Sequence, residues 1–198
     1  RSMVDVKKIL VTGGARSGKS GFAQNLAYRM SPEGRVLYIA TAKVFDWEME
    51  QRVKKHQESR PATWDTYEGY QNLADVIRQK SKVYDVILLD CVTVMLTNLL
   101  FDHIGEQDPD TLQKAQTEEL DQMAKEEARR LIQGIRAADC HVIAVTNELG
   151  MGVVPERLLG RIFRDMAGRT NQTLAEGMSN VVFMVSGLPL YVKGGDLR

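Results

Sequence analysis

The chain has 198 residues, of which 43% are hydrophobic and 26% are charged, and this composition excludes a disordered or fibrous protein. Lysine plus arginine (26) equals aspartate plus glutamate (26), so no overall charge attracts nucleic acid or an anionic membrane, and any basic site must be local. No apolar stretch approaches the roughly 20 residues that a membrane span requires. We expect a single domain over residues 3–198, with Arg1 and Ser2 left over from expression.

The expected secondary structure alternates short apolar runs with helical patterns. The runs are rich in β-branched residues and nearly continuous, as in a parallel sheet that helices cover on both faces, so we predict a doubly wound α/β sandwich. The expected strands are residues 9–12, 36–40, 86–89, 142–146 and 181–185, with an edge strand at 190–192. The expected helices are residues 18–30, 46–59 with Asp46 as N-cap, 110–138 and 157–177.

The pattern over 110–138 carries an apolar stripe on a charged background. This stripe favours packing in the core or against a neighbouring subunit over a cofactor site. Its members are Leu112, Leu120, Met123, Leu131, Ile132 and Ile135.

The two cysteines, Cys91 and Cys140, each lie inside an apolar run. Together with an N-terminus that lacks a signal-peptide pattern, they favour reduced core thiols in a cytoplasmic protein. A buried disulfide between them is the alternative.

The strongest motif follows the first expected strand. The pattern G-x-x-x-x-G-K-[ST] between a strand and a helix is typical of a loop that holds phosphates with backbone N–H groups and a helix N-terminus. Lys19 is expected to reach the β- and γ-phosphates, and Ser20 to bind Mg²⁺ together with Asp90 at the end of another strand. The loop therefore predicts a P-loop NTPase (RecA-like) three-layer sandwich. The motif residues are Gly13, Gly14, Ala15, Arg16, Ser17, Gly18, Lys19 and Ser20.

Simpler interpretations of these residues stay open. The loop could be a chance glycine-rich turn, Asp90 could cap a turn, and Arg16 could face solvent instead of a phosphate.

A histidine lies between two arginines on the second expected helix. Arg52, His56 and Arg60 recur at four-residue spacing, so we expect them to share one helix face. The guanidinium groups would lower the pKa of the imidazole and hold phosphate oxygens, leaving a neutral nitrogen able to act as a nucleophile. From these residues alone, an ordinary solvated helix face is the simpler interpretation. His103 and His141 have weaker claims to a role.

Several segments together resemble the bifunctional adenosylcobinamide kinase / adenosylcobinamide-phosphate guanylyltransferase family of cobalamin biosynthesis. The most specific are Arg-x-x-x-His-x-x-x-Arg-Pro, which begins at Arg52, and Thr-Asn-Glu-x-Gly-x-Gly-x-x-Pro, which begins at Thr146. The phosphate loop and residues 38–42, 64 and 164–172 also match, and the resemblance extends from about Ile9 to Gly187.

This resemblance implies an enzyme that phosphorylates adenosylcobinamide with ATP or GTP, and then transfers GMP from GTP to adenosylcobinamide phosphate. The transfer is implied to pass through a histidine–GMP intermediate on His56, which reverses the simpler interpretation of that residue, with Lys19 stabilising the charge. A homo-oligomer is also implied. Further GTP contacts are implied at Thr41, Ala42, Lys43, Gln57, Glu58, Ser59, Arg60, Glu68 and Asp90.

The sequence departs from the family pattern at two positions. Some relatives carry a second histidine where this chain has Lys55, which still leaves one nucleophile. Some carry a glutamate where this chain has Asp90, and the shorter carboxylate could place a water between itself and Mg²⁺.

Other functions are kept as alternatives. A plain small-molecule kinase predicts γ-phosphate transfer without labelling of the protein by the α-phosphate, and some relatives perform only the transferase step. A nucleotide switch or RecA-like motor subunit predicts GTP binding with turnover that cobinamide does not change. Asn147, Glu148 and the glycines around Met151 could close over the corrinoid or form a flexible connection.

Overall fold

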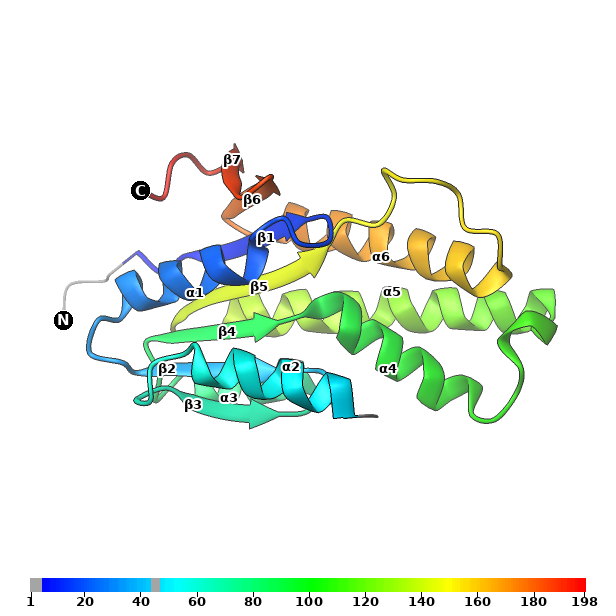
Figure 1. Cartoon of the computed structure of the whole chain (residues 1–198), viewed down its shortest axis with the longest axis horizontal. Coiled ribbons are helices and arrows are strands. Elements are labelled where there is room, and N and C mark those ends of the chain that lie inside the picture. Colours follow the sequence, from blue (N-terminus) through cyan, green and yellow to red (C-terminus); the bar gives the residue numbers. More distant parts are fainter. Residues whose placement is uncertain (1–4, 44–46) are drawn as a thin grey trace.

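A seven-stranded sheet is the centre of the computed structural model, which describes residues 5–43 and 47–198. The strand order is β3-β2-β4-β5-β1-β6-β7, and all neighbours are parallel except β6 and β7. The α/β architecture with a mostly parallel sheet is therefore confirmed (Figure 1). The strands are β1 (Lys8–Gly13), β2 (Val36–Ala40), β3 (Asp65–Glu68), β4 (Val86–Asp90), β5 (His141–Asn147), β6 (Asn180–Val185) and β7 (Leu188–Lys193).

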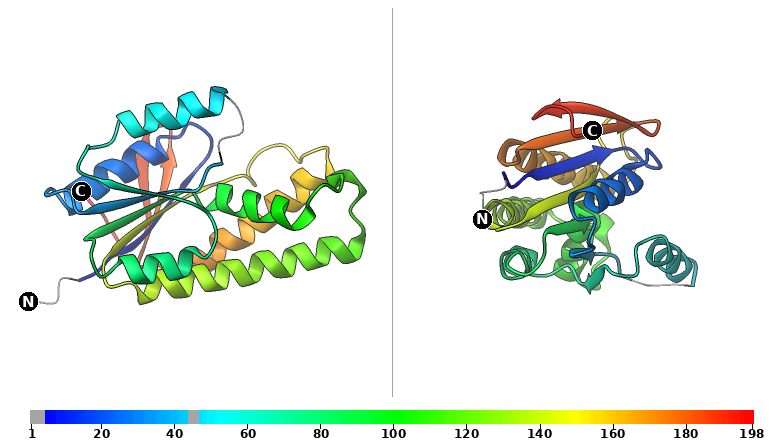
Figure 2. Two further views of the ribbon diagram at one scale, coloured as in Figure 1. Left: turned by 90° about the horizontal axis from the view of Figure 1, so that it is seen from below. Right: turned by 90° about the vertical axis from the view of Figure 1, so that its left-hand side faces the viewer.

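Helices lie on both faces of the sheet (Figure 2). One face carries α1 and α2, and the other carries α3, α5 and α6, so the structure has the three layers expected of the fold. The helices are α1 (Lys19–Met30), α2 (Trp47–Glu58), α3 (Leu73–Lys80), α4 (Val92–Ile104), α5 (Lys114–Ala137) and α6 (Leu158–Gly177), with a 3-10 turn η1 (Pro109–Thr111) before α5.

The core consists of two apolar layers separated by the sheet. Because side chains alternate along a strand, Leu10 of β1 packs with α3, α5 and α6, whereas Ile9 and Val11 pack against α1. Each fully buried side chain of this size stabilises the fold by about 1.5–3 kcal/mol. A third cluster fastens α4, α5 and α6 together beyond the carboxyl edge of the sheet, through residues such as Leu100, Leu120 and Ile162.

Helix α2 differs from these helices because it buries none of its residues. Its first residue, Trp47, is 73% exposed. Figure 2 shows α2 standing apart from the sheet on the side of α1. Only Met49 and Val53 of this helix are half-buried, so its packing against the rest of the protein is slight.

The sequence missed one strand and two helices. β3 is a short edge strand of mostly exposed residues, so no apolar run marks it. The helices α3 and α4 were not anticipated either, because α3 is short and α4 is apolar on most sides. The helix expected over 110–138 is divided into η1 and α5, since Pro109 begins the 3-10 turn and Gln113 with Gln116 forms a capping box.

The other boundaries agree closely with expectation. Gly18 becomes the N-cap of α1, Arg157 the N-cap of α6, and the edge strand extends from Leu188 to Lys193. The stripe on α5 packs in the core, as expected. The N-cap at Asp46 and the extra residues Arg1 and Ser2 lie outside the described residues.

Candidate functional site

The phosphate loop connects β1 to α1 and is held from both sides by backbone hydrogen bonds. Glu148 N–H donates to Gly13 O at 2.8 Å, and Gly187 N–H donates to Ser17 O at 2.9 Å. Gly18 has a φ of 91°, a left-handed conformation that favours glycine. The loop therefore opens directly onto the N-terminus of α1, where the helix dipole favours anions.

Lys19 already lies within this loop. Its Nζ donates to Gly14 O at 2.6 Å, and the residue is 8% exposed. Burial lowers the pKa of the ammonium group, while Cys91 and Asp90 oppose that shift. The amino group is thus held beside the backbone that would surround a phosphate.

The structure brings together the two residues expected to bind Mg²⁺. Ser20 Oγ donates to Asp90 Oδ2 at 3.1 Å. The phenol of Tyr38, on the adjacent strand β2, donates to the same Asp90 oxygen at 2.8 Å. Burial and then the Asp90 charge raise the pKa of Tyr38, so the phenol stays protonated and acts as the donor.

A cavity of about 580 Å³ lies between the phosphate loop and α2. Both predicted catalytic residues, Lys19 and His56, line it, although they come from different elements. Among the described residues, four cationic side chains and no carboxylate line this cavity. Because the chain has no net charge, it needs a local basic site to bind phosphates, and this cavity is such a site. The lining residues are Arg16, Ser17, Gly18, Lys19, Ser20, Gly21, Arg52, Lys55, His56 and Ser59.

The expectation that two arginines flank His56 on one helix face is half wrong. Arg52 is on α2 one turn before His56, where it pairs with Glu48 at 3.2 Å. Arg60 lies beyond the helix, because α2 ends at Glu58 and Pro61 follows shortly after.

Arg60 instead reaches the sheet. Its guanidinium carbon lies 3.7 Å from the centre of the Tyr38 ring, which is a cation–π contact. Its Nη1 atom is buried and has no hydrogen-bond partner among the described residues.

Most of the remaining predicted nucleotide contacts lie at the carboxyl edge of β2, β3 and β4, whereas Gln57 and Glu58 lie at the end of α2. Glu68 and Asp90 are both in register with Ala40. Thr41 is buried, and its hydroxyl donates to Cys91 O at 2.8 Å. Lys43 pairs with Asp102 at 2.9 Å. Ala42, Gln57, Glu58 and Glu68 are exposed, and none of these four lines the cavity.

Sequence reasoning missed Tyr38, Tyr70 and Asp102 as residues of this edge. Tyr38 carries the only hydroxyl of the apolar strand β2. A buried tyrosine hydroxyl needs a hydrogen-bond partner, and this need was the sequence feature that could have indicated its role. No sequence feature indicated Tyr70 and Asp102 as the partners of Lys43. Asp102 is on α4, a helix that the sequence did not predict.

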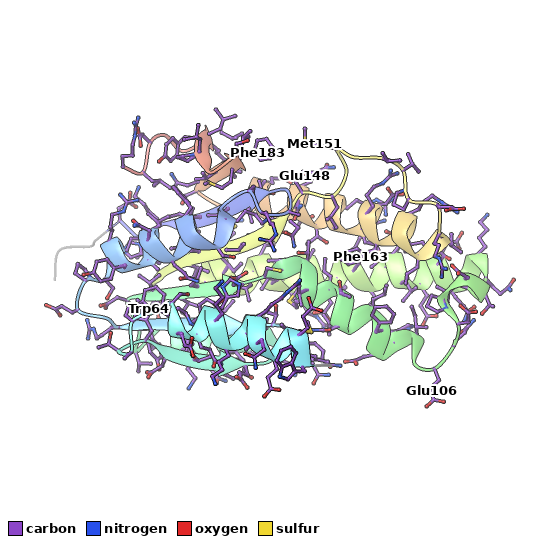
Figure 3. All side chains as sticks on the ribbon, viewed as in Figure 1. Trp64, Glu106, Glu148, Met151, Phe163 and Phe183 are labelled. Carbon is purple, nitrogen blue, oxygen red and sulfur yellow. The ribbon has the colours of Figure 1, made fainter. Side chains whose placement is uncertain are left out.

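The segment after β5 also lies at this edge (Figure 3). Asn147 Nδ2 donates to Thr93 Oγ1 at 2.6 Å, and Glu148 accepts a hydrogen bond from Gly150 N–H at 2.7 Å. Farther along, Met151 is 78% exposed and Val153 is 93% exposed. This segment therefore presents apolar side chains to solvent beyond the carboxyl edge of the sheet (Figure 1).

The other candidates are accounted for by structural contacts. His103 pairs with Glu119 at 3.4 Å, and His141 Nδ1 accepts a hydrogen bond from Lys7 N–H at 2.9 Å. Cys91 and Cys140 are free and buried, as expected. None of the described helices has the length and apolar character needed to cross a membrane.

Comparison with known proteins identifies close relatives of this chain. The family model for cobinamide kinase / cobinamide phosphate guanyltransferase matches residues 9–192. The chain is 44% identical over 185 residues to the bifunctional adenosylcobalamin biosynthesis protein CobU of Escherichia coli, covering 93% of this chain and 99% of the relative. The Salmonella typhimurium CobU gives the same identity and coverage. The bifunctional CobP of Pseudomonas aeruginosa is 38% identical over 188 residues, 95% of this chain and 98% of the relative.

Proposed function

Since the chain belongs to the cobinamide kinase / cobinamide phosphate guanyltransferase family, we propose that its phosphate loop and His56 together carry the guanylyl transfer. The enzyme phosphorylates adenosylcobinamide with a nucleoside triphosphate and transfers GMP from GTP to adenosylcobinamide phosphate, within adenosylcobalamin biosynthesis. The observation that carries the residue assignment is the cavity of about 580 Å³ that the phosphate loop and His56 share.

The loop holds the triphosphate of GTP through its backbone N–H groups and the N-terminus of α1. An unprotonated imidazole nitrogen of His56 attacks the α-phosphorus, a phosphorus–nitrogen bond forms, and the bond to the bridging oxygen breaks as pyrophosphate leaves. A phosphate oxygen of adenosylcobinamide phosphate then displaces His56 and gives adenosylcobinamide-GDP. Lys19, Arg52 and Lys55 lie around this cavity, where they stabilise the charge that spreads over the phosphates.

Ser20 and Asp90 fit a Mg²⁺ ion, because a hydroxyl and a carboxylate meet here at 3.1 Å beside the phosphate loop. A bound Mg²⁺ would neutralise phosphate charge in both reactions. The kinase reaction needs no covalent intermediate, since the loop has only to hold the γ-phosphate in line with the substrate hydroxyl.

The nucleotide contacts proposed outside the cavity are Thr41, Ala42, Lys43, Gln57, Glu58, Arg60, Glu68 and Asp90. The place of Thr41, Ala42, Lys43, Glu68 and Asp90 at the carboxyl edge of the sheet supports their assignment, since α/β sheets bind ligands at the carboxyl ends of their strands. Gln57, Glu58 and Arg60 instead adjoin His56 and Ser59, which line the cavity. We also propose a cytoplasmic homo-oligomer. Two free buried cysteines and the exposed apolar residues of β7, such as Leu188 and Leu190, support that proposal.

GTP labelled at the α-phosphate tests the histidine intermediate. The wild-type protein should retain label through an acid-labile, base-stable bond, and His56→Ala should retain none. His103→Ala is the matched control, because His103 is on a different helix and pairs with Glu119. Label on the His56→Ala protein would exclude His56, and γ-phosphate transfer without any α-label would indicate a plain kinase.

A further inference from the structure

Tyr38 makes two contacts that link different parts of the site. Its hydroxyl donates to Asp90 Oδ2 at 2.8 Å, and its ring lies under the Arg60 guanidinium at 3.7 Å. We propose that Tyr38 is a positioning residue, which orients the metal-binding carboxylate and fastens the end of the helix that carries His56. This inference rests on the proposed function, in which Asp90 faces Mg²⁺ and His56 is the nucleophile.

The hydroxyl contact restricts how the Asp90 carboxylate can turn. The terminal torsion of an aspartate is broad, so a free carboxylate samples many orientations. Here Tyr38 and Ser20 both donate to Oδ2, and neither bond uses Oδ1. When Ser20 turns to a metal ion, the bond from Tyr38 remains. Carboxylates that bind metals are commonly held by such hydrogen bonds.

Tyr38 is suited to this task because its side chain is held in place by packing. It is 5% exposed and packs in the apolar layer between the sheet and α1. A phenylalanine at this position would keep the ring and remove the single hydrogen bond.

The ring contact acts on the far end of α2. This helix buries none of its residues, and Met49 and Val53 are half-buried, so packing holds it less firmly than it holds α1, α3, α4, α5 and α6. Arg60 follows the last helical residue, Glu58, by two positions and stacks on the sheet through Tyr38. The stack thereby holds the C-terminal end of the His56 helix against the sheet.

Two substitutions separate these contacts. Tyr38→Phe should raise the Mg²⁺ concentration needed for half-maximal GTP binding, measured by calorimetry, by about tenfold, since loss of a bond of this kind costs 10–100-fold in metal affinity. Amide hydrogen exchange in residues 47–58 should not change in this variant. Arg60→Ala should accelerate that exchange and slow the labelling of His56 at saturating GTP and Mg²⁺.

Tyr84→Phe is the matched control for the hydroxyl, because Tyr84 also donates to an aspartate, Asp65, at 2.6 Å. An unchanged Mg²⁺ requirement in Tyr38→Phe would overturn the role of the hydroxyl. Unchanged exchange in α2 of Arg60→Ala would overturn the role of the ring. A wild-type protein that retains no α-phosphate label would contradict the proposed function. The Mg²⁺ titration and the amide hydrogen exchange would still test the roles of the Tyr38 hydroxyl and ring, because neither measurement depends on labelling.

Discussion

Lys43 and Asp102 form an ion pair of 2.9 Å that joins the segment after β2 to the last turn of α4. Tyr70 takes part in the same contact, because its hydroxyl donates to Asp102 and its ring centre lies 4.5 Å from the Lys43 amino group. Lys43, shortly after the end of β2, is thus fastened to α4 beyond the sheet edge.

Asp102→Ala should therefore weaken GTP binding while the fold is kept. Without Asp102, Lys43 loses the partner that holds it at the carboxyl edge of the sheet, where we propose that it contacts the nucleotide. The KM for GTP should therefore rise, and kcat should change little. The free energy of unfolding should fall by no more than about 1 kcal/mol, as is usual for an exposed ion pair. Steady-state kinetics and urea unfolding measure both quantities. Asp196→Ala removes an ion pair with Arg198 and is the control; an equal effect of both variants on KM would contradict this explanation.

Gly18→Ala should destabilise the protein and impair nucleotide binding. The left-handed φ of 91° costs a residue with a side chain about 1–2 kcal/mol, and the new Cβ would lie 3.2 Å from Gly187 Cα. Gly14→Ala is the comparison in the same loop, since a Cβ there meets no atom within 4 Å. Urea unfolding should separate the two variants clearly, and similar losses of stability would show that the loop is not shaped as described.

Gly134→Ala and Gly168→Ala should change stability in opposite directions. A Cβ on Gly134 of α5 would lie 2.7 Å from Ala74 Cα of α3, so the two helices must move apart, at a cost of about 1–3 kcal/mol. A Cβ on Gly168 of α6 meets no atom within 4 Å, so alanine should stabilise its helix by about 0.4–1 kcal/mol. Thermal unfolding measures both changes, and a stabilised Gly134→Ala protein would refute the close packing of α3 on α5.

Lys8→Met should alter how stability depends on pH. Lys8 is buried and donates to Ala138 O at 2.6 Å and Cys140 O at 2.7 Å, and burial lowers its pKa from 10.5, against the effects of Cys140 and Asp139. Between the lowered pKa and 10.5 the unfolded chain binds more protons than the folded protein, so this group makes stability rise with pH.

The difference between the unfolding free energies of wild type and Lys8→Met should therefore increase toward pH 10. At neutral pH the variant should lose about 1–3 kcal/mol, because two buried carbonyl groups lose their donor. Urea unfolding from pH 7 to pH 10 measures this. Parallel curves for the two proteins would show that the pKa of Lys8 does not differ between the folded and unfolded states.

The sequence predicted those elements whose pattern is local. Three elements show this: the strand before Gly13, the helix after Gly18 and the buried strand that ends at Asp90. In each, an apolar stretch lies next to the glycine-rich or polar residues that mark its end. Their meeting at one edge follows from parallel pairing, so the contact between Ser20 and Asp90 was predictable.

Features that depend on tertiary contacts were not predictable. The early end of α2 removes Arg60 from the helix face of His56, and only the folded sheet offers Tyr38 as its new partner. Likewise β3 has no apolar run, because an edge strand with exposed residues is stabilised by pairing with β2 and not by burial. These are the cases in which tertiary packing overrides local pattern.

The bond between Gly187 and Ser17 has a consequence for the synthesis of the protein. The loop leaves the ribosome near the beginning of translation, but the turn that braces it follows only when almost the whole chain has been made. At typical elongation rates this delay is on the order of ten seconds or more. A nascent chain that ends before β6 thus contains the complete nucleotide-binding motif and the Glu148 bond to Gly13, but lacks the second backbone bond that holds the loop.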